Sequence, residues 1–195
     1  MRYSTRDIAT IGLFVALSAT SVYIARIVPP VMIFGVSVPI SFMPAISALS
    51  GILLGPKNGA TAMFVYLIGG LIGLPIYAGG TGGPQYIFAP TFGFIIGFIV
   101  AAWLAGVIAA RTNRLTRLTA AAVLALVPLY AIGIVYMALI SDFYLRQPVS
   151  IGALTISMGP FMIKDVVENI GAGALAAALM RRLAPERDAS ASAGR

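Results

Sequence analysis

The chain contains no cysteine and no histidine among its 195 residues. Their absence excludes disulfides, thiol nucleophiles, imidazole acid–base catalysis and metal sites built from these side chains. Charge is also scarce, because 10% of the residues are charged, where a soluble domain carries roughly 25%. So few charges cannot cover the surface of a soluble protein. Most of this surface is therefore expected to face lipid.

Apolar residues are abundant instead, at 59% of the chain, with a mean hydropathy of +0.98. Proline and glycine clusters divide the apolar sequence into runs, most clearly at Pro29-Pro30 and Gly55-Pro56. The runs predict an all-α integral membrane protein with six transmembrane helices. The expected helices are Asp7–Val28, Pro39–Leu54, Ala60–Leu74, Thr91–Ala110, Leu118–Ile140 and Gly159–Arg182.

The regions between and after these helices complete the predicted organisation. A short β-rich stretch is expected at Val31–Val38, and the first helix is expected to be retained because no small-residue cleavage site follows it. Residues 1–183 then form one membrane domain that binds a substrate. Residues 184–195 are rich in alanine and serine and are predicted to form a disordered cytoplasmic tail.

The distribution of basic residues predicts the orientation of the chain. The net charge of +7 could suggest nucleic-acid binding, but the basic residues lie in short connections and at both ends, as membrane topology requires. One predicted side has Arg26 and Arg146, and the other collects Arg2, Arg6, Lys57, Arg111, Arg114, Arg117, Arg181, Arg182, Arg187 and Arg195. Both termini are therefore predicted to be cytoplasmic, in the inner (plasma) membrane, with no nucleic-acid partner.

An uncharged, glycine-rich segment, Pro75–Pro90, lies on the predicted outer side. Glycines allow a ligand to approach the backbone closely, and tyrosine rings offer stacking surfaces, so the segment suits a small, partly apolar ligand. The alternative is a flexible exposed loop. The segment contains no phosphate-binding lysine motif. The candidate ligand residues are Tyr77, Gly79, Gly80, Thr81, Gly82, Gln85 and Tyr86.

Three ionisable residues near the outer end of the last helix, Lys164, Asp165 and Glu168, form a second candidate site. Lys164 and Glu168 are four residues apart, so they share a helix face. Ionisable side chains within a membrane helix usually face the bundle interior or a water-filled pocket. They could instead lie at the membrane interface, with the lysine reaching outward. Asn169 extends the polar patch inward and favours the functional interpretation.

Small residues at a four-residue spacing, Gly12, Ala16 and Thr20, follow one line of the first helix. This spacing lets two membrane helices approach closely, either within the bundle or against a partner protein. Enzyme signatures are missing, since no nucleophile motif and no paired-acid metal motif occurs. The chain is therefore predicted not to be an enzyme and to need no cofactor or metal.

Several motifs together resemble the biotin-transport S component, the BioY family of energy-coupling-factor transporters. The resemblance covers most of residues 5 to 183 and is most specific around the glycine-tyrosine segment. Its motifs are Pro39-Ile40-Ser41; Leu53 to Ala60 around Gly55-Pro56; Gly73-Leu74-Pro75-Ile76-Tyr77-Ala78-Gly79-Gly80 with Gly82-Gly83; Pro90-Thr91, Gly93-Phe94 and Gly97-Phe98; and Pro160-Phe161 followed by Asp165.

The resemblance implies a protein that captures biotin and has no catalytic centre. Asp165 would accept hydrogen bonds from the ureido N–H groups, and Lys164 would pair with the carboxylate. In the glycine-tyrosine segment, the tyrosines would pack the rings. Donors to the ureido carbonyl would come from Gln85, Thr81 or the loop amides. The implied partners are a membrane coupling subunit, contacted through Gly12 and Ala16, and two cytoplasmic ATPase subunits.

Four positions depart from the family pattern. Met43 replaces a glutamine, Glu168 replaces a lysine, Lys164 occupies a position that is usually small, and Ala89 replaces a glycine. These departures leave a different vitamin-like ligand open. A permease that works without a coupling module and an intramembrane enzyme remain further alternatives from other functional classes.

Overall fold

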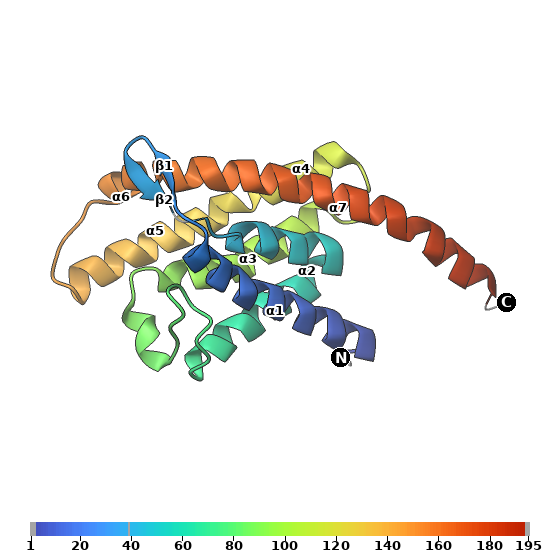
Figure 1. Cartoon of the computed structure of the whole chain (residues 1–195), viewed down its shortest axis with the longest axis horizontal. Coiled ribbons are helices and arrows are strands. Elements are labelled where there is room, and N and C mark those ends of the chain that lie inside the picture. The colour runs from blue at the N-terminus through green and yellow to red at the C-terminus, as the bar shows by residue number, and fades with distance from the viewer. Residues whose placement is uncertain (1–2, 39, 194–195) are drawn as a thin grey trace.

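A computed structural model describes residues 3–38 and 40–193, with side chains through residue 182 apart from 33, 36 and 38. The described chain is a helical bundle with one small β-hairpin (Figure 1). The elements in chain order are α1 (Thr5–Ile27), β1 (Val31–Ile33), β2 (Val36–Val38), α2 (Met43–Leu71), the 3₁₀ helix η1 (Pro84–Phe88), α3 (Phe92–Ile108), α4 (Leu115–Leu124), α5 (Leu126–Phe143), α6 (Ile151–Ser157) and α7 (Gly159–Ala193).

The helix α1 has well-defined signals at both ends. The Ser4 side chain accepts from the Asp7 amide, and the Asp7 carboxylate accepts from the Ser4 amide, which forms a capping box. The helix ends at Ile27, just before Pro29-Pro30. The β-rich stretch predicted next is confirmed as an antiparallel hairpin in which Val31 pairs with Val38 and Ile33 pairs with Val36.

The helix α2 folds back on itself at the predicted breaker. Gly55 takes a left-handed backbone conformation (φ 84°) and Pro56 follows it, so the helix has a sharp kink. A Cβ atom on Gly59 would lie 2.6 Å from the Gly51 Cα, which shows that the two halves of α2 touch. The break that the sequence predicted between two helices is therefore confirmed. Pro39, the predicted start of the first of them, lies outside the described residues.

Small residues bring α3 close to its neighbours. A Cβ atom on Gly93 would lie 2.3 Å from the Tyr136 Cβ, and one on Gly97 would lie 2.9 Å from a Leu129 methyl group, so both glycines pack against α5. On the other side, a Cβ atom on Gly51 of α2 would lie 1.8 Å from the Ala102 carbonyl oxygen. The Gly93 and Gly97 motif thus has a packing function in this chain.

The second half of the chain differs in detail from the prediction. The helix predicted over Leu118–Ile140 is present as α4 and α5, which meet at Ala125. The connection predicted over Ser141–Ser157 contains the short helix α6, capped by Ser150, which the sequence reasoning missed. The helix α7 is assigned as Gly159–Ala193, whereas its predicted end was Arg182. The predicted tail, 184–195, falls on residues whose side chains lie outside the description, and it stays a prediction.

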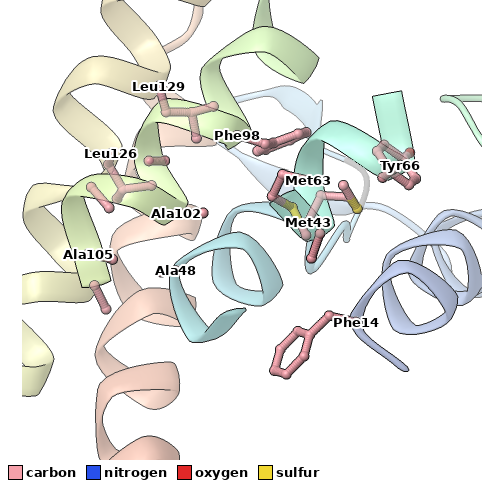
Figure 2. Close-up of a cluster of buried hydrophobic side chains, with 14 of the residues drawn as sticks. Phe14, Met43, Ala48, Met63, Tyr66, Phe98, Ala102, Ala105, Leu126 and Leu129 are labelled. Carbon is pink, nitrogen blue, oxygen red and sulfur yellow. The ribbon is translucent and has the colours of Figure 1, made fainter. Parts of the chain in front are cut away.

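The buried core is apolar and rich in alanine. Figure 2 shows Met43 and Met63 within this core, with Phe98 and Tyr66 on either side of them. The helices α1 and α4–α5 (Thr5–Ile27 and Leu115–Phe143) are long and apolar enough to cross a membrane, and α3 is a shorter apolar helix. Large apolar side chains are exposed on the outside of the main helices, as lipid contact requires. Examples are Leu17 on α1, Phe64 on α2, Trp103 on α3, Val127 on α5 and Leu175 on α7.

The basic positions and the glycine-rich connection lie at opposite ends of the bundle. The start of α1, the connection between α3 and α4, and the end of α7 lie toward one end, whereas the hairpin and α6 lie toward the other (Figure 1). The assignment of these two ends to the two sides of a membrane, made from the distribution of arginines and lysines, stays a prediction.

Candidate ligand-binding site

A cavity of about 400 Å³ opens at the end of the bundle that holds the hairpin and the glycine-rich connection. Its walls come from segments far apart in the sequence: the last turns of α1, both halves of α2, the connection 72–91, and α3, α5 and α7. The lining is mostly apolar, with Met43, Phe98, Leu129, Met137 and Phe161 among its side chains. Cavities of this size and character bind small organic molecules.

Asp165 on α7 is the central polar group of the cavity and is only 5% exposed. Its Oδ2 accepts a hydrogen bond from the Tyr130 hydroxyl of α5 at 2.6 Å. Its Oδ1 lies 2.6 Å from the Lys164 Nζ. Asn169, one turn further along α7, donates to the Asp165 backbone carbonyl at 2.8 Å. A carboxylate can accept about four hydrogen bonds, so Asp165 keeps acceptor capacity for a ligand.

Lys164 has three acceptors around its ammonium group. Besides Asp165, it lies 3.1 Å from Glu168 Oε1 and donates to the Ser41 carbonyl at 3.1 Å. Since a lysine has three N–H donors, these partners can use all of them. The contact with Ser41 also ties α7 to the segment that leads from the hairpin into α2. Lys164 and Asp165 both line the cavity, so these two members of the predicted polar cluster face inward.

The glycine-tyrosine segment forms a tight, ordered connection. Tyr77 and Thr81 pair as an isolated antiparallel bridge, and the turn between them uses positive φ at Gly79 (76°) and Gly80 (69°). Tyr77 is completely buried, and its hydroxyl donates to the Leu67 carbonyl. Burial, with a smaller contribution from the neighbouring Tyr86, raises the pKa of Tyr77 to about 12. The phenol therefore stays neutral and keeps donating.

The segment contributes fewer cavity residues than the sequence suggested. Gly79 and Tyr86 line the cavity, and Tyr77 lies behind Tyr86 with their ring centroids 4.6 Å apart. The remaining predicted positions are not among the lining residues: Gly80, Thr81, Gly82 and Gln85. Thr81 donates to the Ala78 carbonyl and Gln85 to the Gly82 carbonyl, so both side chains stabilise the turn.

Gly82 and Glu168 also occupy positions other than those expected. A Cβ atom on Gly82 would lie 2.1 Å from the Leu74 carbonyl oxygen, so this glycine allows the connection to pack on its own backbone. Glu168 lines a separate hollow of about 320 Å³ between α1, α2 and α7. It reaches the cavity only through Lys164. Glu168 is four residues after Lys164 on α7, so its side chain lies about one helical turn further from the cavity.

Tyr130 and Arg26 are among the cavity residues that the sequence reasoning missed. Tyr130 lies within an apolar run, where the available signal was a single hydroxyl in an otherwise apolar helix. Arg26 was counted only as one of two basic residues on the outer side, yet it lines the cavity. No sequence spacing links either residue to the site, because Arg26 reaches it through the packing of α1 on the glycine-rich turn and Tyr130 through the hydrogen bond from α5 to α7.

The small residues on α1 lie on its outer face. Gly12, Ala16 and Thr20 are exposed, and a Cβ atom on Gly12 would meet no atom within 4 Å. Of the two interpretations of this spacing, close packing inside the bundle is therefore wrong for Gly12. The surface remains available to another molecule.

The comparison with known proteins decides the family. The family model described as "BioY family" matches residues 1–185. The chain belongs to the BioY family. Its relatives include "Biotin transporter BioY" of Rhodobacter capsulatus, 34% identical over 88% of this chain and 91% of that protein. Another is "Probable biotin transporter BioY" of Pyrococcus horikoshii, 31% identical over 84% of this chain and 89% of that protein.

A solved structure has the same fold as this BioY chain. It is the S component for biotin from an ECF-type ABC transporter, with a TM-score of 0.71 and 21% sequence identity, and the match covers 92% of this chain and 95% of that one. The predicted all-helical architecture is thus confirmed, and the resemblance found from the motifs is confirmed as family membership. With the apolar helices, membership identifies the chain as a membrane protein.

Proposed function

We propose that this chain is the substrate-capture subunit, or S component, of a vitamin uptake transporter. It binds biotin from the outside and works with an ATPase module. The observation that carries the proposal is the Asp165 carboxylate, which keeps acceptor capacity and opens on an apolar cavity of about 400 Å³. The printed names of its relatives, "Biotin transporter BioY", support biotin as the ligand.

The chemistry of biotin fits this cavity. Its ureido ring carries two N–H donors and one carbonyl acceptor, and its second ring is an apolar thioether. In the proposed complex, the free acceptor sites of Asp165 receive the ureido N–H groups, and hydrogen bonds to a carboxylate are stronger than neutral ones. Tyr86, Phe98 and Met137 then supply apolar contacts to the bicyclic rings.

One position motivates a second candidate ligand. Met43 stands where the family usually has glutamine, and it is a buried wall residue of the cavity, 4% exposed. A thioether in place of an amide removes a donor and an acceptor from the pocket. Another small vitamin-like molecule with fewer polar groups on that side is therefore the alternative, and it must be tested beside biotin.

The proposed orientation follows from the bundle and its charges. We count six membrane crossings: α1, the two halves of α2 on either side of Gly55, α3, α4 with α5, and α7. The basic residues Lys57, Arg111 and Arg181 then lie on the cytoplasmic side, with both termini. The cavity faces outward. The proposed location is the inner (plasma) membrane, because the cytoplasmic ATPase subunits can supply energy to a partner only in a membrane that faces the cytoplasm.

The proposed partners are a membrane coupling subunit and two cytoplasmic ATPase subunits. The solved structure with the same fold is an S component of an ECF-type ABC transporter, which supports such a module. The exposed line of Gly12, Ala16 and Thr20 is the proposed contact with the coupling subunit. Small side chains on an outer face allow a second helix to approach the α1 backbone closely.

The direct test is equilibrium binding of labelled biotin to the purified chain, in competition with dethiobiotin, lipoate and thiamine. The proposal requires saturable biotin binding, with stronger competition by dethiobiotin than by lipoate or thiamine. Preferred binding of lipoate or thiamine would favour the second candidate ligand, and binding of none of them would contradict both.

A second experiment separates a coupled subunit from a self-sufficient permease. Uptake of biotin is measured in a host that lacks any coupling module, with and without co-expression of one. The proposal requires uptake only with the module. Uptake by the chain alone would favour a permease, and turnover of the ligand that the substitution Asp165→Asn abolishes would favour an enzyme.

A further inference from the structure

Arg26 stands at the rim of the cavity, close to the glycine-rich turn. It lies in the last turn of α1 and is exposed, yet it is one of the residues that line the cavity. A Cβ atom on Gly80 would lie 2.6 Å from the Arg26 Nη1, so the guanidinium group packs against the backbone of the turn. An alanine at position 80 would force the arginine to move.

The end of α1 is held against this same connection. The Tyr23 hydroxyl, one turn before Arg26, donates to the Pro75 carbonyl at 2.7 Å. The hydrogen bond and the Gly80 contact fix Arg26 on the wall made by α1 and the connection 72–91. Asp165 lies on another wall, where α7 meets Tyr130 of α5. The polar groups of the cavity are thus divided between two walls.

The two cations that line the cavity differ in their partners. Lys164 has Asp165, Glu168 and the Ser41 carbonyl around it, which can use its three N–H donors. In the part of the chain that the structure describes, Arg26 has no ion pair. Asp142, the other acid near this end, lines a different hollow beside α6. The positive charge that remains uncompensated at the cavity is therefore that of Arg26.

We infer that Arg26 binds the carboxylate of the ligand and makes this site selective for a free acid. The inference rests on the proposed function and deepens it, because it assigns the two polar ends of the ligand to different walls. The guanidinium group is planar and matches a carboxylate with two parallel hydrogen bonds. Lys164 is then a positioning residue that holds Asp165, and the ligand's acid end lies toward the α1 wall.

The test measures the affinity of purified wild-type chain for biotin and for two ligands with the same rings and no charge, biotin methyl ester and biotinamide. The same three ligands are measured with Arg26→Gln, with Arg26→Lys and with a matched control, Arg146→Gln. Arg146 is an exposed arginine at the same end of the bundle that is not among the residues lining the cavity.

We expect the wild-type chain and Arg146→Gln to prefer biotin over its neutral analogues by about two- to fivefold, which is the upper part of the range for an exposed charge pair. Arg26→Gln should lose this preference while its affinity for the neutral analogues changes by less than about twofold, and Arg26→Lys should keep part of it. Unchanged affinity for the neutral analogues also shows that the variant is folded.

Two results would overturn the inference alone. One is a wild-type chain that binds biotin and its methyl ester equally well, which decides the matter even if Arg26→Gln fails to fold. The other is an Arg26→Gln variant that keeps the wild-type preference. If no ligand in the series binds the wild-type chain, the proposed function itself fails, and that outcome is distinct from both.

Discussion

The Tyr130 hydroxyl of α5 donates a 2.6 Å hydrogen bond to Asp165 Oδ2 of α7, and it does so from 35 residues away in the sequence. This bond and the Lys164 contact to Oδ1 hold the carboxylate in one orientation. A buried charge is stable only when it is paired and hydrogen-bonded. The arrangement keeps Asp165 ready to accept from a ligand without reorganisation.

Asp165→Asn should weaken biotin binding by about 1–3 kcal/mol, because the ligand loses hydrogen bonds to a charged acceptor and the amide presents one oxygen only. Calorimetric titration of the purified variant measures this. The matched control is Asp142→Asn, an exposed acid that lines a different hollow, which should bind as the wild type does. Unchanged affinity in Asp165→Asn would remove the role assigned to this carboxylate.

Tyr130→Phe should weaken ligand binding by about 0.5–1.5 kcal/mol while the ring still packs against Phe94 at a centroid distance of 5.7 Å. The cause is indirect, since the carboxylate loses one of the two groups that orient it. Affinity measurements should be paired with Tyr144→Phe, an exposed tyrosine stacked on Phe88. A loss of the same size in both variants would mean that the hydroxyl of Tyr130 has no specific role.

Gly82→Val should lower both the stability of the purified chain and its ligand affinity. The reason is internal packing, because a Cβ atom at position 82 would lie 2.1 Å from the Leu74 carbonyl oxygen, and overpacking of this kind costs about 1–3 kcal/mol. Thermal unfolding in detergent measures the loss. Gly152→Val, the same substitution at an exposed position where a Cβ atom would meet no atom within 4 Å, is the control, and a neutral result for Gly82→Val would indicate a loosely packed loop.

Ala16→Leu should leave biotin affinity unchanged and reduce coupled uptake at least about tenfold. A leucine on the outer face of α1 keeps a partner helix from close approach, whereas the cavity lies beside the last two turns of α1, at Val22 and Arg26. Ala120→Leu, which enlarges an exposed alanine on α4, serves as the control. Normal uptake with Ala16→Leu would place the coupling contact elsewhere.

The sequence predicted the helices well because their limits depend on local chemistry. Pro29-Pro30 ends α1, and Gly55 with Pro56 breaks α2. Asp165 and Lys164 were also found from the sequence, since charges inside an apolar helix are expensive and rarely accidental. Such signals are carried by single residues and their near neighbours.

The missed features depend on distant packing. Arg26 and Tyr130 join the cavity only because α1 meets the glycine-rich turn and α5 meets α7. Thr81 and Gln85 have side chains that could bind a ligand, yet each donates to a backbone carbonyl three residues away. The short α6 lies in a connection that the sequence suggested was irregular. No local pattern distinguishes these arrangements from their alternatives.

The position of biotin in a structure of the purified chain with bound ligand tests the central claim most directly. We expect the ureido nitrogens within hydrogen-bonding distance of the Asp165 carboxylate, with the bicyclic rings against Tyr86 and Phe98. Biotin bound at saturation outside this cavity, or inside it with its ureido group away from Asp165, would contradict the account.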